Sequence, residues 1–211
     1  MMRRILIADD HPIVRQGLMK IVTDAFSPVQ VEEAQTGQGV IDAVRKGAWD
    51  AVVLDITLPD KNGLEVLKEV RLLRPNQRVL MLSFHGEEQY AVRALKAGAA
   101  GYLTKDHATT EIVHALTKVF QGGRYVSASL AERLADKLEA NTGTVPHESL
   151  SDREHEVLCL LAKGKTATEI GDQLALSVKT VSTYRARVLE KLGLTTTAEL
   201  IRYALDHKLV E

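Results

Sequence analysis

The first part of the chain alternates short apolar runs with amphipathic helical segments, and this alternation constrains the fold more than any other feature. Residues 51–54 are continuously apolar, whereas Leu64, Leu67 and Val70 recur at the spacing of one helix face. Strands that alternate with helices in this way form a parallel sheet with helices on both faces. The predicted strands are 4–8, 29–33, 51–54, 78–82 and 100–104, and the predicted helices are 12–25, 37–46, 63–73, 87–97 and 109–120.

Five strands joined by helices fit a flavodoxin-like, doubly wound α/β fold with the strand order 2-1-3-4-5. In that order the first and third strands flank the switch point, and the carboxyl ends of the strands share one edge, where ligands bind. Polar residues follow four of these ends. They are Asp9 and Asp10 after the first strand, Asp55 after the third, Ser83 after the fourth and Lys105 after the fifth.

Carboxylates gathered at this edge favour a divalent cation. Each residue alone could be a helix cap, because Asp and Ser often cap helices, but caps need not share one edge. Asp9, Asp10 and Asp55 would repel one another without a cation between them, and Mg²⁺ binds a few carboxylates together with water and phosphate oxygens. The backbone carbonyl of Thr57 is a further candidate ligand. His11 follows the acidic pair, but imidazole suits softer metals, so we do not expect it to bind Mg²⁺.

A carboxylate can also act as a nucleophile and form an aspartyl-phosphate. Asp55 is our candidate, because it stands alone at the end of the central strand. Phosphoryl transfer depends on charge neutralisation and positioning more than on acid–base help. Lys105 would hold one phosphoryl oxygen as a point charge, and Ser83 would donate a hydrogen bond to another.

The predicted site is carried by Asp9-Asp10-His11-Pro12, Asp55-Ile56-Thr57-Leu58-Pro59, Asn62-Gly63-Leu64-Glu65, Ser83 and Gly101-Tyr102-Leu103-Thr104-Lys105. With these motifs, residues 1–122 resemble the receiver domain of two-component response regulators. The resemblance implies that Asp55 is the phosphoacceptor. It also implies that Asp10, Asp55 and the carbonyl of Thr57 bind Mg²⁺, with Asp9 assisting.

The same resemblance implies that Ser83 and Lys105 contact the phosphoryl group. Tyr102, three residues before the lysine, falls at the position of the switch aromatic of receivers. The alternative is an ordinary strand aromatic, because tyrosine favours strands. Asp106 follows the lysine where many receivers have proline, and this departure leaves the geometry of that peptide bond open.

From about residue 150 onward the pattern is helical throughout. Ser151 and Glu154 have the spacing of a capping box, and Gly164 and Gly193 are candidate helix ends. A short charged helix is predicted before this region, over 127–140. A linker at 141–146 is then followed by predicted helices at 152–163, 167–174, 178–192 and 197–207.

Two of these helices, joined by a short turn, follow the helix-turn-helix plan. On the second helix Val181, Tyr184, Val188 and Leu192 recur at intervals of three and four residues and should face the core. The opposite face carries a local excess of positive charge, although short basic faces are also common on solvated helices. The candidate DNA-binding residues are Lys179, Thr180, Ser182, Thr183, Arg185 and Arg187.

The C-terminal motifs are Leu150-Ser151-Asp152-Arg153-Glu154, Glu156-Val157-Leu158, Ile170-Gly171, Leu176-Ser177-Val178-Lys179-Thr180-Val181 and Leu189-Glu190-Lys191-Leu192-Gly193. Through them, residues 148–211 resemble a LuxR-type helix-turn-helix domain. A receiver followed by such a domain is the architecture of response regulators of the NarL/FixJ type.

The base-reading positions of that family map onto Ser182, Thr183 and Ala186, which are all small here. Some members of the family have lysines at these positions. This departure leaves the preferred DNA sequence open, and it shifts the expected readout toward Lys179, Thr180 and Arg187.

The composition limits the partners and the compartment. The formal net charge is −1, so any binding to a polyanion must come from a local patch. The single cysteine, Cys159, excludes an intrachain disulfide and is compatible with a reducing compartment. No apolar run approaches the roughly 18 residues of a membrane span, so we predict a cytoplasmic protein without a membrane partner.

The sequence therefore predicts a transcription regulator. We expect a sensor histidine kinase to phosphorylate Asp55. The altered surface should then either favour a homodimer that binds double-stranded DNA or release the DNA-binding domain. The predicted parts are a receiver domain at 1–122, a linker with the charged helix at 123–147, and the DNA-binding domain at 148–211. We expect no enzymatic activity apart from its own phosphoryl transfer and autodephosphorylation. The alternatives are an interaction adaptor that has lost DNA binding and a self-dephosphorylating phosphotransfer protein.

Overall fold

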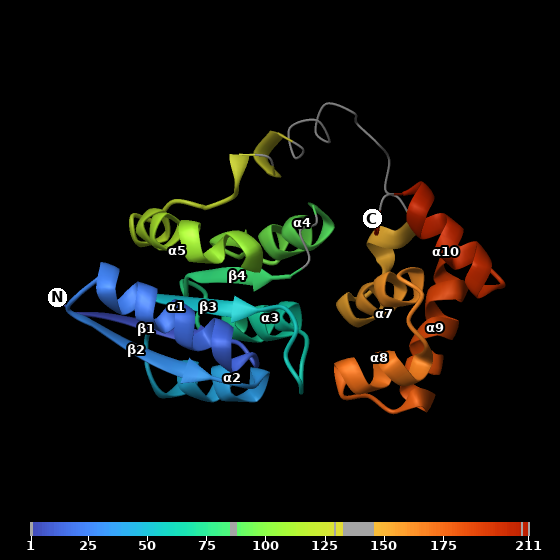
Figure 1. The fold of residues 1–211 in the computed structure, drawn as a ribbon, viewed down its shortest axis with the longest axis horizontal. Coiled ribbons are helices and arrows are strands. Elements are labelled where there is room, and N and C mark those ends of the chain that lie inside the picture. Colours follow the sequence, from blue (N-terminus) through green and yellow to red (C-terminus); the bar gives the residue numbers. More distant parts are fainter. Residues whose placement is uncertain (1, 85–87, 129, 133–145, 208, 211) are drawn as a thin grey trace. The chain divides into compact units, whose positions relative to one another are not determined.

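The computed structural model describes residues 2–84, 88–128, 130–132, 146–207 and 209–210. The chain divides into two compact units, residues 1–139 and 140–211, which Figure 1 colours along the sequence. The helix expected over 127–140 and the linker expected over 141–146 lie largely outside the described residues. No helix in the described part of the chain is long and apolar enough to cross a membrane.

The strands of the first unit are β1 (Arg3–Ala8), β2 (Val29–Ala34), β3 (Ala51–Asp55), β4 (Val79–Ser83) and β5 (Gly101–Thr104). They form one parallel sheet in the order β2-β1-β3-β4-β5, which confirms the predicted fold. The register pairs Asp55 with Leu82 and Ser83 with Thr104, so the carboxyl ends of these strands are nearly level. Side chains that follow these ends consequently lie at one edge of the sheet.

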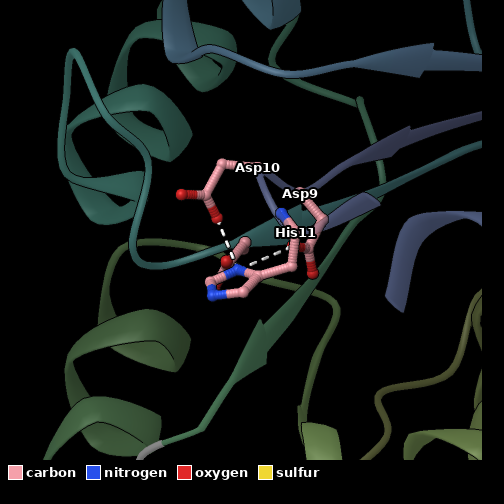
Figure 2. Close-up of side chains that lie close together, drawn as sticks. Asp9, Asp10 and His11 are labelled. Atoms are coloured by element: carbon pink, nitrogen blue, oxygen red, sulfur yellow. Dashed lines mark hydrogen bonds and ion pairs between the residues drawn. The ribbon is translucent and has the colours of Figure 1, made fainter. Parts of the chain in front are cut away.

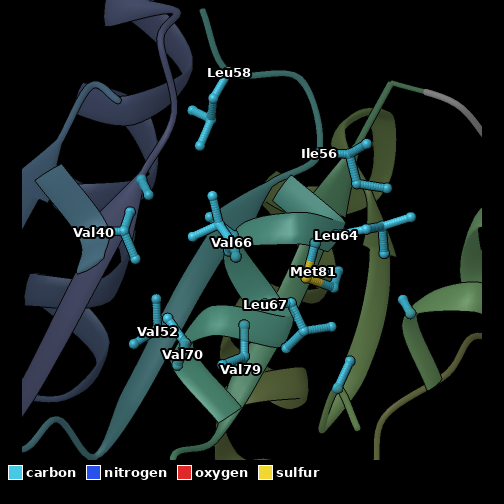
Figure 3. Packing of buried hydrophobic residues seen from close by; sticks show 14 of the residues in the cluster. Val40, Val52, Ile56, Leu58, Leu64, Val66, Leu67, Val70, Val79 and Met81 are labelled. Atoms are coloured by element: carbon cyan, nitrogen blue, oxygen red, sulfur yellow. The ribbon is translucent and has the colours of Figure 1, made fainter. Parts of the chain in front are cut away.

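The helices around this sheet are α1 (Pro12–Ala25), α2 (Gly37–Lys46), α3 (Gly63–Leu73), α4 (Glu88–Lys96) and α5 (Lys105–Phe120). On one face, α2, α3 and α4 pack on strand residues such as Val52 and Met81, and Figure 3 shows Leu64, Leu67 and Val70 of α3 in this cluster. On the other face, α1 and α5 form the second buried cluster. The predicted start of α4, residue 87, lies outside the described residues.

The helix that was predicted from residue 109 begins earlier, at Lys105, so α5 follows β5 without a loop. Thr104 is its N-cap, and Asp106 lies in its first turn, where a negative charge interacts favourably with the helix dipole. The one cis peptide bond among the described residues precedes Pro28. The bond between Lys105 and Asp106, whose geometry the sequence left open, is therefore trans.

The second unit is helical and contains η1 (Pro146–Ser149), α7 (Asp152–Ala162), α8 (Ala167–Leu174), α9 (Val178–Leu192) and α10 (Thr197–Asp206). Its core includes Val157, Ile170, Val181, Val188 and Leu200. Ser151 and Glu154 form the predicted capping box at the start of α7. Two glycines follow helices with left-handed backbone angles, as expected of helix ends. They are Gly164 with φ 80° and Gly193 with φ 68°.

The turn between α8 and α9 is tight because a glycine lies under it. The backbone N–H of Leu176 donates to the carbonyl of Gly171 at 2.8 Å, and a Cβ at Gly171 would lie 2.6 Å from the Leu176 carbonyl oxygen. Ala175, the C-cap of α8, adopts a left-handed backbone conformation with φ 52°, and the chain reverses direction there. The Ser177 side chain then caps α9 by accepting a hydrogen bond from the Thr180 N–H at 3.1 Å. These contacts fix the start of α9 relative to α8.

Candidate functional site

Lys105 joins two carboxylates at the edge of the sheet. Its Nζ lies 2.7 Å from Oδ2 of Asp9 and donates to Oδ2 of Asp55 at 2.6 Å. These three side chains are at most 1% exposed. They come from the ends of β1 and β3 and from the first residue of α5, so the strand order brings together residues that are far apart in sequence. The structure thus brings together three of the residues predicted to form the site.

Burial changes the electrostatics of Asp55. Removal from water raises its pKa from 3.8 to about 7, the positive charge of Lys105 opposes the rise, and the negative charge of Asp9 adds to it. The N–H of Thr57 donates to Asp55 Oδ1 at 3.2 Å, which holds the carboxylate in place. Because the charged form is disfavoured here, a second cation at this carboxylate would stabilise it.

Asp10 and His11 extend the acidic cluster toward solvent. Figure 2 shows the His11 ring turned toward the Asp10 carboxylate, and the Nδ1–Oδ1 distance between them is 2.6 Å. The backbone N–H of His11 donates to Asp9 Oδ1 at 2.8 Å. Asp9, Asp10, His11 and Asp55 each offer one ligand atom, and these atoms lie within 4.8 Å of one another. The imidazole, which we did not expect to bind Mg²⁺, is therefore within reach of the carboxylates.

Ser83, Thr57 and Tyr102 occupy the neighbouring positions that the strand order predicts. Ser83 is buried at the end of β4, and its register partner Thr104 directly precedes Lys105. Thr57 lies just after β3, where it forms an isolated antiparallel bridge with Asn62. The Tyr102 side chain is 2% exposed and belongs to the same apolar cluster as residues of α3 and α4. It therefore lies inside the fold.

Arg15 supports the acidic turn, and the sequence analysis did not identify it. Its Nη1 donates to the carbonyl of Asp9 at 2.7 Å and its Nε donates to Oε2 of Glu33 at 2.6 Å. The side chain is only 5% exposed. An arginine buried on α1 needs such partners, because an unpaired buried charge is very costly. The position of Arg15 on the inner face of the predicted helix 12–25 is the sequence feature that could have identified it.

Gly63 and Asn62, which belong to one of the motifs of the predicted site, hold the loop after Asp55. A Cβ at Gly63 would overlap the carbonyl oxygen of Asp55. The Gly63 N–H donates to the Ile56 carbonyl at 2.7 Å, and the buried Asn62 side chain accepts from the Leu64 N–H at 2.8 Å. The loop can therefore close on the phosphoacceptor candidate only with glycine at this position.

Phe84 is a further neighbour that the sequence did not indicate. Its ring centroid lies 4.5 Å from Lys105 Nζ and 5.5 Å from the ring centroid of His11, in an edge-on arrangement. The side chain is about half exposed. An aromatic face attracts an ammonium group, so Phe84 covers the cation that joins the two carboxylates.

The second candidate surface is the outer face of α9. Lys179, Ser182, Thr183 and Arg187 are exposed there, and Thr180 is half-buried. The hydroxyl groups of Ser182 and Thr183 donate to the carbonyls of Val178 and Lys179, at 2.9 and 3.0 Å. Both hydroxyls thus remain able to accept hydrogen bonds at the surface.

Other basic residues of α9 make contacts within the second unit. Arg185 Nε donates to the Thr197 hydroxyl at 2.8 Å, and Lys191 Nζ donates to Glu154 Oε2 at 2.6 Å. Their charges are thereby directed toward α10 and α7. On the inner face Val181 and Val188 are buried as predicted, Tyr184 and Leu192 are half-buried, and Leu189 is buried as well.

Both parts of the chain match known protein families. Residues 5–117 match the family model of the response regulator receiver domain, and residues 148–204 match that of the luxR family of bacterial regulatory proteins. The first match covers the candidate acidic site, and the second covers α7, α8 and α9. The match to the second model ends within α10.

Relatives and solved structures share this arrangement over nearly the full length. The chain is 35% identical to the response regulator UvrY of Escherichia coli over 209 residues, which cover 99% of this chain and 96% of UvrY. It is 35% identical to the response regulator GacA of Pseudomonas aeruginosa over 211 residues, 100% of this chain and 99% of GacA. RcsB of Salmonella enterica serovar Typhimurium, solved on a promoter with the phosphomimetic BeF₃⁻, is similar with a TM-score of 0.60 and 27% identity, over 95% of this chain and 97% of RcsB.

The two matches lie in one chain, the receiver domain before the luxR-type domain, and the chain aligns with these response regulators over nearly its full length. The chain therefore belongs to the two-component response regulators of the NarL/FixJ type, in which a receiver domain is joined to a LuxR-type helix-turn-helix DNA-binding domain.

Proposed function

We propose that a sensor histidine kinase phosphorylates Asp55 and that this modification controls the binding of α9 to double-stranded DNA. The observation that carries the proposal is the buried contact of one lysine with two carboxylates, where Lys105 meets Asp9 and Asp55. A cation that already neutralises an aspartate is positioned to neutralise a phosphoryl group on it. The family supports the partner, because receiver domains accept phosphoryl groups from such kinases.

The donor set suits Mg²⁺. Several carboxylates within 4.8 Å of one another offer hard oxygen ligands, and Lys105 is the cation that contacts two of them. Asp10, Asp55 and the carbonyl of Thr57 would hold the ion, with Asp9 assisting. The bound ion would neutralise charge on the transferred group. His11 would release Asp10 when the ion binds, because their 2.6 Å contact uses a ligand oxygen.

Asp55 acts as the nucleophile. One of its carboxylate oxygens forms a bond to phosphorus, while the bond from phosphorus to the donor nitrogen breaks and leaves its electron pair on the kinase histidine. Lys105 then contacts a phosphoryl oxygen instead of the carboxylate, and Ser83 donates a hydrogen bond to another. Tyr102, which lies inside the fold, packs behind Ser83. Water can later attack the same phosphorus. The bond from phosphorus to the Asp55 oxygen then breaks, which regenerates the carboxylate, releases inorganic phosphate and accounts for autodephosphorylation.

The outer face of α9 enters the major groove. Lys179 and Arg187 contact phosphates or bases, and Thr180, Ser182 and Thr183 lie near base edges. Arg185 stands at the margin of this face, because it is half-buried against Thr197. A homodimer of the phosphorylated protein would present two such helices to half-sites about one DNA turn apart. A structure of two RcsB dimers on two DNAs supports this arrangement by similarity.

The functional boundaries follow from the same proposal. The receiver domain comprises residues 1–122, the linker residues 123–147 and the DNA-binding domain residues 148–211, in a cytoplasmic protein. An adaptor that has lost DNA binding is the weaker alternative, because Lys179 and Arg187 remain exposed on α9. A phosphotransfer protein that only dephosphorylates itself would leave that basic face without a role.

Labelling by acetyl phosphate tests the phosphoacceptor. With Mg²⁺ the wild-type protein should gain the mass of one phosphoryl group, and Asp55→Asn should gain none. Asp24→Asn is the matched control, because it removes an exposed carboxylate from α1, and its labelling should equal that of the wild type. Undiminished labelling of Asp55→Asn, or full labelling of the wild type in excess chelator, contradicts the proposal.

A further inference from the structure

The chain that leaves α5 returns to the sheet and pairs with the free side of β5. The N–H of Tyr102 donates to the Tyr125 carbonyl at 3.0 Å, and the N–H of Tyr125 donates to the Ala100 carbonyl at 2.9 Å. Gly101 and Tyr125 form an isolated parallel bridge. Tyr125 therefore acts as a one-residue addition to the sheet, bonded to the backbone of the strand that carries Tyr102.

This pairing depends on the glycine at the start of β5. A Cβ at Gly101 would lie 2.5 Å from the Tyr125 carbonyl oxygen and 2.9 Å from Cδ1 of Leu80. Real Cβ atoms essentially never approach a backbone oxygen so closely, so a larger residue would displace Tyr125 from the edge. Gly101 is thus explained by close backbone approach.

The Tyr125 side chain is anchored on the face of the sheet covered by α1 and α5. It is 5% exposed, and its hydroxyl donates to Glu111 Oε2 at 2.6 Å. Its ring also meets the His114 ring edge-on at 5.6 Å between centroids. Burial raises the pKa of Tyr125, and Glu111 raises it further, so the hydroxyl remains a neutral donor.

The next residues are anchored on the opposite face. Val126 is half-buried and Leu130 is 7% exposed, and both pack with the apolar cluster that contains Tyr90 and Tyr102. Neighbouring residues of a strand point to opposite faces of a sheet, and Tyr125 and Val126 follow this rule. The segment therefore packs with both buried clusters of the first unit, and one of these clusters also contains the candidate switch residue Tyr102.

We infer that Tyr125, Val126 and Leu130 form a strap that positions β5 and transmits the state of Tyr102 to the chain leading toward the second unit. Tyr102 is tied to the strap twice, by its backbone N–H and by the apolar cluster that it shares with Leu130. These two connections give a change in the packing of Tyr102 a route to the strap. Tyr125 is a positioning residue in this scheme, and the inference rests on the proposed control of DNA binding by Asp55.

The test measures the dissociation constant for DNA of the unphosphorylated protein and divides it by that of the protein treated with acetyl phosphate. The DNA is a duplex selected from a random pool with the treated wild-type protein. Tyr125→Phe removes the hydrogen bond to Glu111, and Leu130→Ala removes most of the Leu130 side chain from the apolar cluster that also contains Tyr102. We expect the double variant to lower the ratio by roughly 2- to 30-fold toward one. Its labelling at Asp55 should match that of the wild type.

Hydrogen exchange and a matched variant complete the test. The amides of Tyr102 and Tyr125 donate the strap hydrogen bonds, so both should exchange faster in the double variant. Leu72→Ala removes a leucine that is 83% exposed in the same unit and should leave the ratio unchanged. If the double variant keeps the wild-type ratio, the inference is overturned. If the Tyr102 and Tyr125 amides of that variant nevertheless exchange fast, the strap is loosened but transmits nothing. If they exchange as slowly as in the wild type, the two side chains do not anchor the strap. A wild-type ratio of one would instead overturn the proposed function.

Discussion

The burial of Asp55, the proposed phosphoacceptor, carries a cost to stability. A carboxylate that is 1% exposed loses most of its hydration, and Asp9 adds a second negative charge nearby. Lys105 offsets part of this cost but has to serve two carboxylates. Without a metal ion, the folded first unit should therefore favour the protonated form of Asp55 more than the unfolded chain does.

This preference predicts a pH dependence of stability in excess chelator. The pKa of Asp55 is raised to about 7 from 3.8, so between these values the folded state binds more protons than the unfolded state. The free energy of unfolding should therefore fall as pH rises through this window, by up to about 1.4 kcal/mol per pH unit from this group, and level off above it. Urea unfolding of the wild type and of Asp55→Asn, followed by fluorescence, measures the difference.

The comparison between the two proteins isolates Asp55 from other titrating groups. Trp49 is the single tryptophan of the chain and lies in the first unit, buried beside α2 with its Nε1 donating to the Ala43 carbonyl at 3.2 Å. Its fluorescence therefore follows the unfolding of this unit. Parallel pH curves for the two proteins would contradict the proposed burial of an ionisable Asp55.

At the scale of helices and strands, the hydrophobic periodicity of the sequence was sufficient to predict the architecture but not the individual contacts between elements. The strand order and the helix-turn-helix pair could be predicted, because apolar runs and helical spacing are local signals. The start of α5 was predicted four residues too late, because residues 105–108 were assigned to neither the predicted strand nor the predicted helix.

Contacts between elements had no local signal. Arg15 was missed because its partners, Asp9 and Glu33, are defined only once β2 pairs with β1. Lys191 of α9 pairs with Glu154 of α7, a contact that the sequence did not indicate. The sequence thus predicted which residues meet at the acidic edge, and the fold was needed to identify what supports them.

The outer face of α9 leads to a prediction about salt dependence. Lys179→Ala and Arg187→Ala should each weaken binding to all DNA sequences and lower the slope of log K against log salt by about 1, if the side chain contacts phosphate. If Lys179 instead reads a guanine, discrimination at one base pair should relax by about 1–3 kcal/mol. Binding curves at several salt concentrations distinguish these two results.

Arg202→Ala is the matched control for this helix. Arg202 is an exposed arginine in the same unit but belongs to α10, where its Nε lies 3.7 Å from Asp206 Oδ2. Its removal should leave the salt slope close to that of the wild type. Wild-type affinity and slope in both α9 variants would show that this helix does not enter the groove.

The whole molecule consists of two units that have separate cores, and a separate ligand is proposed for each. One core lies around the sheet and the other among α7 to α10. A ligand stabilises the state that binds it, so Mg²⁺ should raise the midpoint of the transition seen by Trp49. At a concentration of 100 times its dissociation constant, the gain is about 2.7 kcal/mol. A midpoint that does not respond to Mg²⁺ would contradict the metal site, and Asp10→Asn should reduce the response.

The central claim is that a phosphoryl group on Asp55 controls DNA binding, and one titration tests it directly. A duplex selected from a random pool is titrated with wild-type protein and with Asp55→Asn, each with and without acetyl phosphate and Mg²⁺. Acetyl phosphate should tighten binding of the wild type by a factor within about 5 to 150, the usual range of such coupling, and should leave Asp55→Asn unchanged. The same tightening in both proteins, or none in a wild type that is fully labelled, would contradict the claim.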